Sequence, residues 1–232
     1  MMLLTVIIPC FNENKTIKKI LDKIKKQKIK TQIIVVDDFS TDGTREILKK
    51  RLKSKINKLI LHKKNLGKGA AIRSAKKFVK GNIVIIQDAD LEYFPEDYKK
   101  LVNPIIKKIS NVVYGSRVLN KRNYYNRSFS SNFRILANFC LTIISNIINN
   151  QRLTDAHTCY KVFRTDLFKK INLKENDFSF CPEVTTKISI LNEKILEVPI
   201  MYKGRTYKEG KKISFKDGLL ALKTLIKYRY FK

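Results

Sequence analysis

The stretch "IVIIQDADLEY", residues 83–93, decides the fold, because it joins an apolar run to a group of carboxylates. Four apolar residues lead towards Asp88 and Asp90, which are separated only by Ala89. A short, continuously apolar run bounded by polar residues is typical of a strand covered on both faces. Residues two apart in an extended segment point to the same side, so the two carboxylates repel one another unless a cation lies nearby. The segment is therefore a candidate site for a divalent cation, with Glu92 as a third carboxylate; taken alone, it is also compatible with a solvated turn.

Strands and helices alternate on both sides of this segment. Strands are predicted at 4–9, 32–38, 58–63, 82–90, 111–117 and 194–203. Helices are predicted from Ile17 onward, after the turn at 40–44, at 65–80, and at 95–109 with Pro104 as a kink or break. This alternation predicts βαβ units in an α/β fold with a mostly parallel central sheet flanked by helices.

Polar residues collect where four of these strands end. They are residues 10–13, Asp37 and Asp38, the Asp88–Asp90 pair, and Ser116 with Arg117. In an open α/β sheet, ligands bind outside the carboxyl ends of the strands. Four polar strand ends on one edge therefore predict a binding site that rests on more than one motif.

The second half of the chain is less regular and contains two predicted amphipathic helices. In the helix at 134–149, the polar positions are Arg134, Asn138, Thr142, Ser145 and Asn149, and the apolar ones are Leu136, Phe139, Cys140, Ile143, Ile144 and Ile147. In the helix at 215–232, the apolar positions are Phe215, Leu219, Leu222, Leu225 and Ile226, and the basic ones are Lys216, Lys223, Lys227 and Arg229. We divide the chain into a domain at 1–212, with halves at 1–118 and 119–212, and a basic C-terminal helix at 213–232.

The chain has 232 residues, 44% of them hydrophobic, and a formal net charge of +29. This charge predicts an anionic partner, although about half of the excess positive charge is compatible with compositional drift towards AT-rich codons alone. Nucleic acid is disfavoured as that partner, because acidic residues at four strand ends would repel its phosphates. The four cysteines form no metal-binding pattern and predict reduced thiols. We expect neither a signal peptide nor a spanning segment.

The motifs resemble those of a known family when they are taken in order. They are "VIIPCFNE" (6–13), "IIVVDDFSTDGT" (33–44), "NLGKGAA" (65–71), "QDADLE" (87–92), "YGSR" (114–117), "TDAHTCYKVF" (154–163), "FCPEV" (180–184) and "GRTYKEGKKI" (204–213). Together they resemble the family-2 glycosyltransferases of the GT-A, or nucleotide-diphospho-sugar transferase, fold. Within that family they look most like the dolichyl-phosphate and polyprenyl-phosphate mannosyl- or glucosyltransferases.

The resemblance implies roles for the matching positions. The nucleotide-sugar site would comprise Pro9, Phe11, Glu13, Val36, Asp38, Asp88, Ala89, Asp90, Arg117, Arg205 and Lys211. Asp90 would be the main ligand of Mg²⁺ or Mn²⁺, with Asp88 and Glu92 beside it, and Asp88, Asp90 and Arg117 would act in catalysis. Arg117 and Arg127 would bind the acceptor phosphate, and Asp155 and Glu183 occupy two further acidic positions. The chain departs from the family by having Phe11 in place of tyrosine and Glu92 in place of glutamine.

The resemblance also implies an activity, namely inverting transfer of a hexose, with mannose from GDP-mannose favoured, to a polyprenyl or dolichyl phosphate. The acceptor phosphate is already an anion, so such an enzyme needs no strong base. One alternative keeps the fold but transfers a sugar from a UDP-sugar to a sugar hydroxyl, with Asp155 or Glu183 as general base. The implied partners are an anionic membrane surface at the cytoplasmic face, where the enzyme would be peripheral, and a separate membrane-spanning protein.

Overall fold

A computed structural model describes residues 2–119, 129–205 and 215–231 of the chain. Its described strands are β1 (Leu4–Cys10), β2 (Thr31–Asp37), β3 (Lys58–Leu61), β4 (Ile83–Ile86), β5 (Val112–Ser116), β6 (Lys161–Arg164) and β7 (Ile195–Pro199). They form one sheet in the order β3-β2-β1-β4-β6-β5-β7. β1 to β4 pair in parallel, as do β5 and β7, so the prediction of a mostly parallel sheet is confirmed.

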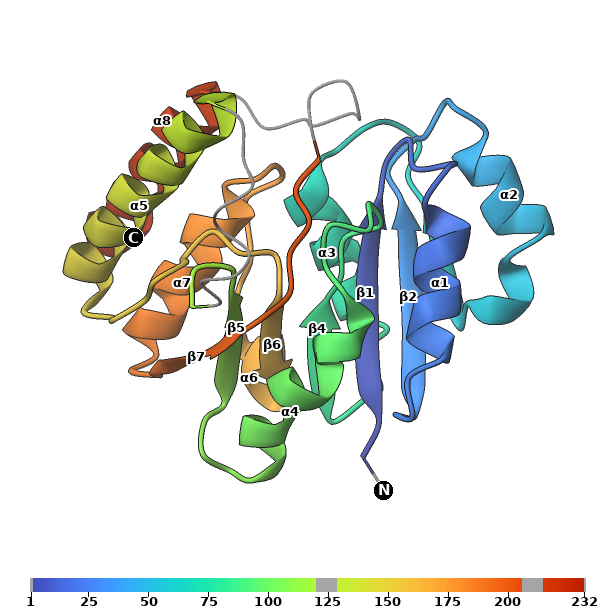
Figure 1. The fold of residues 1–232 in the computed structure, drawn as a ribbon, viewed down its shortest axis with the longest axis horizontal. Coiled ribbons are helices and arrows are strands. Elements are labelled where there is room, and N and C mark those ends of the chain that lie inside the picture. Colours follow the sequence, from blue (N-terminus) through green and yellow to red (C-terminus); the bar gives the residue numbers. More distant parts are fainter. Residues whose placement is uncertain (1, 120–128, 206–214, 232) are drawn as a thin grey trace.

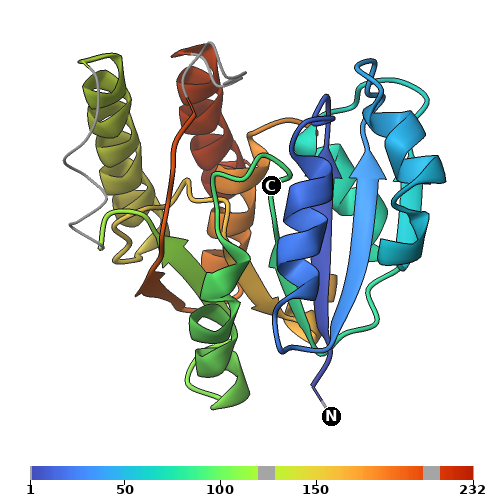
Figure 2. The same ribbon diagram turned by 45° about the vertical axis from the view of Figure 1, so that its right-hand side comes forward.

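Helices cover the sheet and follow the predicted alternation in the first half of the chain (Figure 1). They are α1 (Ile17–Lys25), α2 (Thr44–Lys50), α3 (Lys68–Lys76), α4 (Tyr98–Ile106), α5 (Phe129–Asn149), α6 (Thr165–Lys170), α7 (Phe180–Ile190) and α8 (Phe215–Tyr230), with short 3-10 turns at Lys53–Lys55 and Pro95–Asp97. The apolar face of α1 is fully buried, as its spacing predicted. α5, α7 and α8 pack on one another, and Figure 2 shows α5 and α8 standing side by side.

The strand β6 was not predicted. It runs antiparallel between β4 and β5. Its first residue, Lys161, is fully buried and donates hydrogen bonds from Nζ to the carbonyls of Ala156 and Thr158, both at 2.9 Å. The strand therefore fixes the turn before it, residues 153–158, against the ends of its neighbours.

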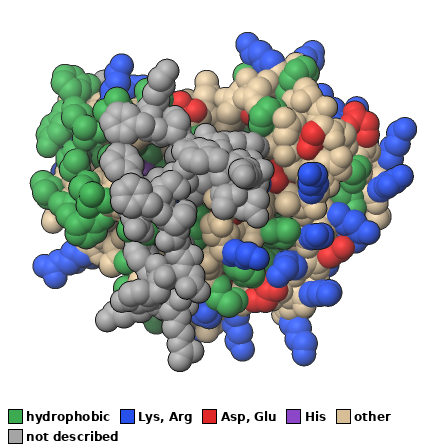
Figure 3. All heavy atoms as spheres, turned by 45° about the horizontal axis from the view of Figure 1, so that its top comes forward, with side chains coloured by type: hydrophobic (Ala, Val, Ile, Leu, Met, Phe, Trp, Pro, Cys, Tyr) green, Lys and Arg blue, Asp and Glu red, His purple; other side chains and the backbone are tan. Residues whose placement is uncertain are grey.

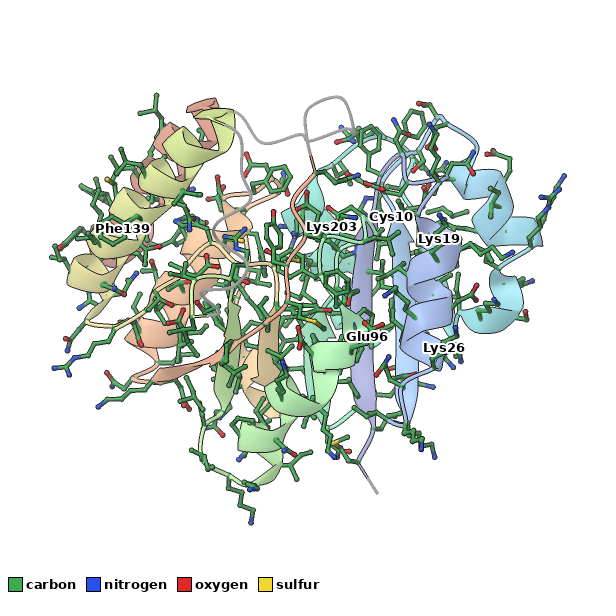
Figure 4. All side chains as sticks on the ribbon, viewed as in Figure 1. Cys10, Lys19, Lys26, Glu96, Phe139 and Lys203 are labelled. Carbon is green, nitrogen blue, oxygen red and sulfur yellow. The ribbon has the colours of Figure 1, made fainter. Side chains whose placement is uncertain are left out.

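Helix α5 turns its polar stripe inward. Thr142, Ser145 and Asn149 are buried, whereas Phe139 and Ile147 are 57% and 77% exposed. This is the reverse of the usual surface helix, which buries its apolar stripe. Figure 4 shows Phe139 on the outer side of α5, and Figure 3 shows hydrophobic side chains gathered over α5 and α8. In the described part of the chain, no helix combines the length and apolar character needed to cross a membrane.

Candidate active site

Three carboxylates meet around one guanidinium at the carboxyl edge of the sheet. β1 and β4 are adjacent and parallel, so Glu13 and Asp90, which follow them, come together. Arg205 Nη1 lies 3.2 Å from Glu13 Oε1, and Arg205 Nη2 lies 2.9 Å from Asp90 Oδ2. Arg205 Nε lies 3.6 Å from Glu92 Oε1. We call Glu13, Asp90 and Glu92 the carboxylate cluster.

A sharp turn brings Glu92 back towards Asp90. Leu91 has a φ of +65°, and the backbone N–H of Glu92 donates to Asp90 Oδ1 at 3.1 Å. Burial, together with the charges of Asp88 and Glu92, raises the pKa of Asp90 to about 7, despite the opposing effect of Arg205. The cluster therefore has more negative charge than one guanidinium neutralises.

The donor atoms of the cluster suit a hard divalent cation, because Mg²⁺ and Mn²⁺ prefer carboxylate oxygens. Within the described ranges, however, no three His, Cys, Asp or Glu side chains are arranged to hold a metal ion. Arg205 lies among these oxygens instead. The residues fit a metal in their chemistry, with Asp90 as its main ligand, provided that Arg205 moves away.

Asp88 is directed to a different cation. Its Oδ1 lies 2.6 Å from Nζ of Lys68, which opens α3 and also donates to Cys159 Sγ at 3.2 Å. Burial opposes the charged amine, yet Asp88 keeps the pKa of Lys68 well above its ordinary value. Ala89 is buried between the two aspartates. The structure therefore separates the D-x-D pair, with Asp90 facing Arg205 and Asp88 facing Lys68.

Arg117 forms a two-point ion pair with a fully buried Asp155. Arg117 Nε and Nη2 lie 2.6 and 2.7 Å from the two carboxylate oxygens, and the Arg117 backbone N–H also donates to Oδ2. Asn138 of α5 adds a further hydrogen bond at 3.2 Å. Although burial opposes ionisation, Arg117 lowers the pKa of Asp155. Asp155 is therefore a weak base, and its place in the fold is to hold Arg117.

The residues expected around the nucleotide lie along β1 and β2. Val36 is fully buried in β2, and Pro9 and Phe11 are half-buried at the end of β1. Asp38 accepts hydrogen bonds from the backbone N–H groups of Leu66 and Gly67, and lies 2.6 Å from His62 Nδ1. Asp38 thus shapes the loop that leads into α3.

Glu183 of α7 also binds backbone. Its two oxygens accept the N–H groups of Lys174 and Glu175 at 2.6 and 2.9 Å, and Lys187 Nζ lies 2.5 Å away. The segment it holds packs against the glycine turn before α3, where a Cβ on Gly67 would lie 2.4 Å from a carbonyl oxygen. Arg127 and Lys211, which were also predicted as site residues, lie outside the described residues.

Three side chains of the site were not predicted. Lys68 lies within the predicted helix 65–80 and the motif at 65–71, and a lysine at the start of a helix that follows a strand end is a recognisable signal. Tyr202 donates to Glu92 Oε2 at 2.8 Å, and the Arg117 guanidinium lies 5.2 Å from its ring centroid. Asn138 was assigned to a polar stripe with no partner. The contacts of Tyr202 and Asn138 form only in the folded chain, so no local sequence pattern predicts them.

Comparison with known proteins identifies the family and the fold. The family model "Glycosyl transferase family 2" matches residues 5–172. A UDP-N-acetylglucosamine–dolichyl-phosphate N-acetylglucosaminyltransferase of Methanococcus voltae is 30% identical over 218 residues, which cover 85% of this chain and 84% of the relative. A dolichyl-phosphate beta-glucosyltransferase of Trichomonas vaginalis is 29% identical over 213 residues, which cover 85% of this chain and 64% of the relative.

A solved structure shows the same architecture. Glucosyl-3-phosphoglycerate synthase of Mycobacterium tuberculosis, crystallised with Mn²⁺, UDP and phosphoglyceric acid, superposes with a TM-score of 0.72. Its sequence identity is 15%, and the match covers 100% of this chain and 80% of the other. At this identity the likeness concerns the fold, which is the predicted GT-A fold.

Proposed function

This chain belongs to glycosyl transferase family 2, and we propose that it transfers a hexose from a nucleotide-diphosphate sugar to a polyprenyl or dolichyl phosphate. The observation that favours a phosphate acceptor is the Arg117–Asp155 pair. A hydroxyl acceptor needs a general base, whereas Asp155 has a lowered pKa and both its oxygens bind Arg117. The site offers a fixed cation in place of a base, which suits an acceptor that is already an anion. The names of the two dolichyl-phosphate transferases support the same acceptor.

The chain's own residues account for the main requirements of this reaction. Arg117, whose side chain remains 20% exposed, would position the acceptor phosphate. Its oxygen needs no proton removed, and a direct attack on the anomeric carbon inverts that centre. Arg205 would contact the diphosphate of the donor, and Asp90 would hold Mg²⁺ or Mn²⁺. When bound, that cation supplies neutralisation of the diphosphate leaving group.

The donor is proposed at the level of a nucleotide-diphosphate hexose or N-acetylhexosamine. The motifs favoured GDP-mannose, whereas the names of similar proteins include a UDP-sugar donor and a beta-glucosyl transfer. The solved neighbour contains UDP. The test therefore compares three donors, GDP-mannose, UDP-glucose and UDP-N-acetylglucosamine.

The test is a transfer assay with purified protein, a short polyprenyl phosphate, Mg²⁺ or Mn²⁺, and each labelled donor in turn. Label in the lipid extract from one donor is the expected result, and Asp90→Asn should abolish it. Arg164→Met provides the matched control, because Arg164 pairs with Asp166 at the surface, away from the carboxylate cluster. If label appears only on a sugar hydroxyl acceptor, the lipid-phosphate assignment is wrong.

We also propose that the outer face of α5 and α8 contacts an anionic membrane surface, at the cytoplasmic side. This surface, which we call the apolar face, comprises Leu136, Phe139, Ile143, Ile147, Leu219, Ile226 and Tyr230, each at least 40% exposed. α5 has no charged residue from 135 to 149. α8 adds the exposed Lys223, which suits anionic lipid headgroups, whereas the exposed Lys227 pairs with Glu175. A separate membrane-spanning protein is the alternative occupant of the same face.

A further inference from the structure

Arg205 fills the position in which the carboxylate cluster would hold a metal. Its guanidinium contacts Glu13 and Asp90 directly and lies beside Glu92, and all four side chains are at least four-fifths buried. One positive charge here faces three carboxylates, whereas a divalent cation brings two. A metal ion at Asp90 and the guanidinium at its present place would repel one another at close range, so they exclude each other.

Glu92 contributes to this arrangement through the backbone as well as through its charge. Its Oε1 accepts the backbone N–H of Arg205 at 2.7 Å, and its Oε2 accepts the hydroxyl of Tyr202 at 2.8 Å. The Glu92 carbonyl also accepts the N–H of Lys203 at 2.9 Å. Residues 202–205, which we call the strap, are thus held to Glu92 by three hydrogen bonds. Both carboxylate oxygens are used for this purpose.

We propose, on the basis of the function proposed above, that Arg205 is the resident counter-ion of the carboxylate cluster and leaves it when a divalent cation binds. Glu92 anchors the strap and is not the metal ligand that its position in the motif suggests. Asp90, and Glu13 beside it, remain as the oxygen donors that face the vacated position.

The Arg205 end of the strap can move while the Tyr202 end stays fixed. Tyr202 pairs with Tyr93 in an antiparallel bridge, and the two rings lie 5.2 Å apart. Beyond this fixed point, Gly204 lets the chain turn closely over the Tyr202 ring, since a Cβ at this position would lie 3.2 Å from it. Arg205 can therefore leave Asp90 while Tyr202 stays in place. Because Arg117 lies over the Tyr202 ring, the acceptor-side cation keeps its support during this exchange.

Direct metal binding tests the exchange without relying on turnover. Mn²⁺ affinity would be measured by electron paramagnetic resonance and calorimetry, in the absence of nucleotide, for the native protein, Arg205→Met and the control Arg164→Met. Removing the competing guanidinium should tighten Mn²⁺ binding about tenfold, within the usual range of coupling between two ligands of one site. The control should leave the affinity unchanged. Equal or weaker Mn²⁺ binding by Arg205→Met would overturn the proposal.

Two further variants separate this inference from the metal assignment itself. Asp90→Asn should lose Mn²⁺ binding; if it binds Mn²⁺ like the native protein, the proposed metal site is wrong. Glu92→Gln should retain Mn²⁺ affinity within about threefold, which is a small change in free energy. A loss as large as that of Asp90→Asn would make Glu92 a ligand and remove its role as anchor.

Hydrogen exchange reports on the strap directly. The Arg205 amide is bonded to Glu92, so a peptide covering 200–205 should exchange slowly in the free protein. Addition of Mn²⁺ should leave this exchange slow, because the Arg205 side chain leaves Asp90 while its amide stays bonded to Glu92. Glu92→Gln should speed it without any ligand. Fast exchange in the native protein on adding Mn²⁺ would contradict the role of Glu92 as anchor.

Discussion

Replacing Ile147 with serine tests whether the apolar face contacts a membrane. Among the described side chains of α5, Ile147 is the most exposed large hydrophobic one, at 77% of its surface. It lies four residues after Ile143 and eight after Phe139, so it shares their exposed side of the helix. Serine at this position removes apolar surface that is already in contact with water, so the folded protein loses little packing.

The expected effect follows from the exposed fraction. Full burial of an isoleucine side chain contributes about 1.5–3 kcal/mol, so removing 77% of that burial costs about 1.2–2.3 kcal/mol. Membrane affinity should therefore fall roughly 8- to 50-fold, while the free energy of unfolding stays within about 0.5 kcal/mol of the native value. Both figures assume that the exposed part of the side chain leaves water completely.

Ile109 provides a matched control. It is 66% exposed, follows the C-terminal end of α4 and lies away from α5 and α8. Ile147→Ser, Ile109→Ser and the native protein would be compared by flotation with vesicles of phosphatidylcholine and phosphatidylserine. If both variants float as well as the native protein, the membrane assignment is wrong. If only Ile147→Ser disrupts a dimer, with vesicle binding absent throughout, a second copy covers this face.

Four further predictions concern the buried polar groups and the glycines. Asp155→Asn should lower the free energy of unfolding by about 3 kcal/mol in urea titrations and should impair transfer, because it leaves the Arg117 charge without its buried partner. Gly67→Ala should destabilise by at least about 1–3 kcal/mol, since φ is +93° and a Cβ would meet a carbonyl oxygen at 2.4 Å. Gly218→Ala in α8, where a Cβ meets only a side chain at 3.8 Å, should instead stabilise by up to about 1 kcal/mol. Burial lowers the pKa of His157 to about 4. The stability that its neutral ring contributes is therefore complete above pH 6.5 and is lost as the pH falls towards 4. Between pH 7 and 5, the free energy of unfolding should fall less in His157→Gln than in the native protein.

The first half of the fold was predictable because each of its strands is a continuous apolar run. β1, β2 and β4 are largely buried; β4 contains only Val and Ile, and so do the central residues of β1 and β2. β6 escaped prediction because it is only four residues long and begins with Lys161. A buried lysine that bonds to two carbonyls looks, in sequence, like a residue of a solvated loop.

The candidate site was predictable in its location and less so in its contacts. The rule that ligands bind at the carboxyl ends of strands brought Glu13, Asp90 and Arg117 to one edge. Arg205 lies more than one hundred residues after Asp90 in the chain, and only the family resemblance predicted it as a site residue. The pairing of Asp88 with Lys68 and of Glu92 with the strap depends on side-chain directions after a turn at Leu91 with positive φ, which periodicity does not describe.

The orientation of α5 has a physical reason in the turn that carries Asp155. Residues 153–156 form no strand or helix, so their backbone groups need partners from elsewhere. Thr142 and Asn146, spaced four apart on one face of α5, supply them to Ala156 and Leu153. Asn138, one turn earlier on the same face, donates to the side-chain carboxylate of Asp155. Because the polar stripe is used on the inside, the apolar stripe is left outside. The same helix thus supports the Arg117 pair on one face and presents Phe139 and Ile147 on the other.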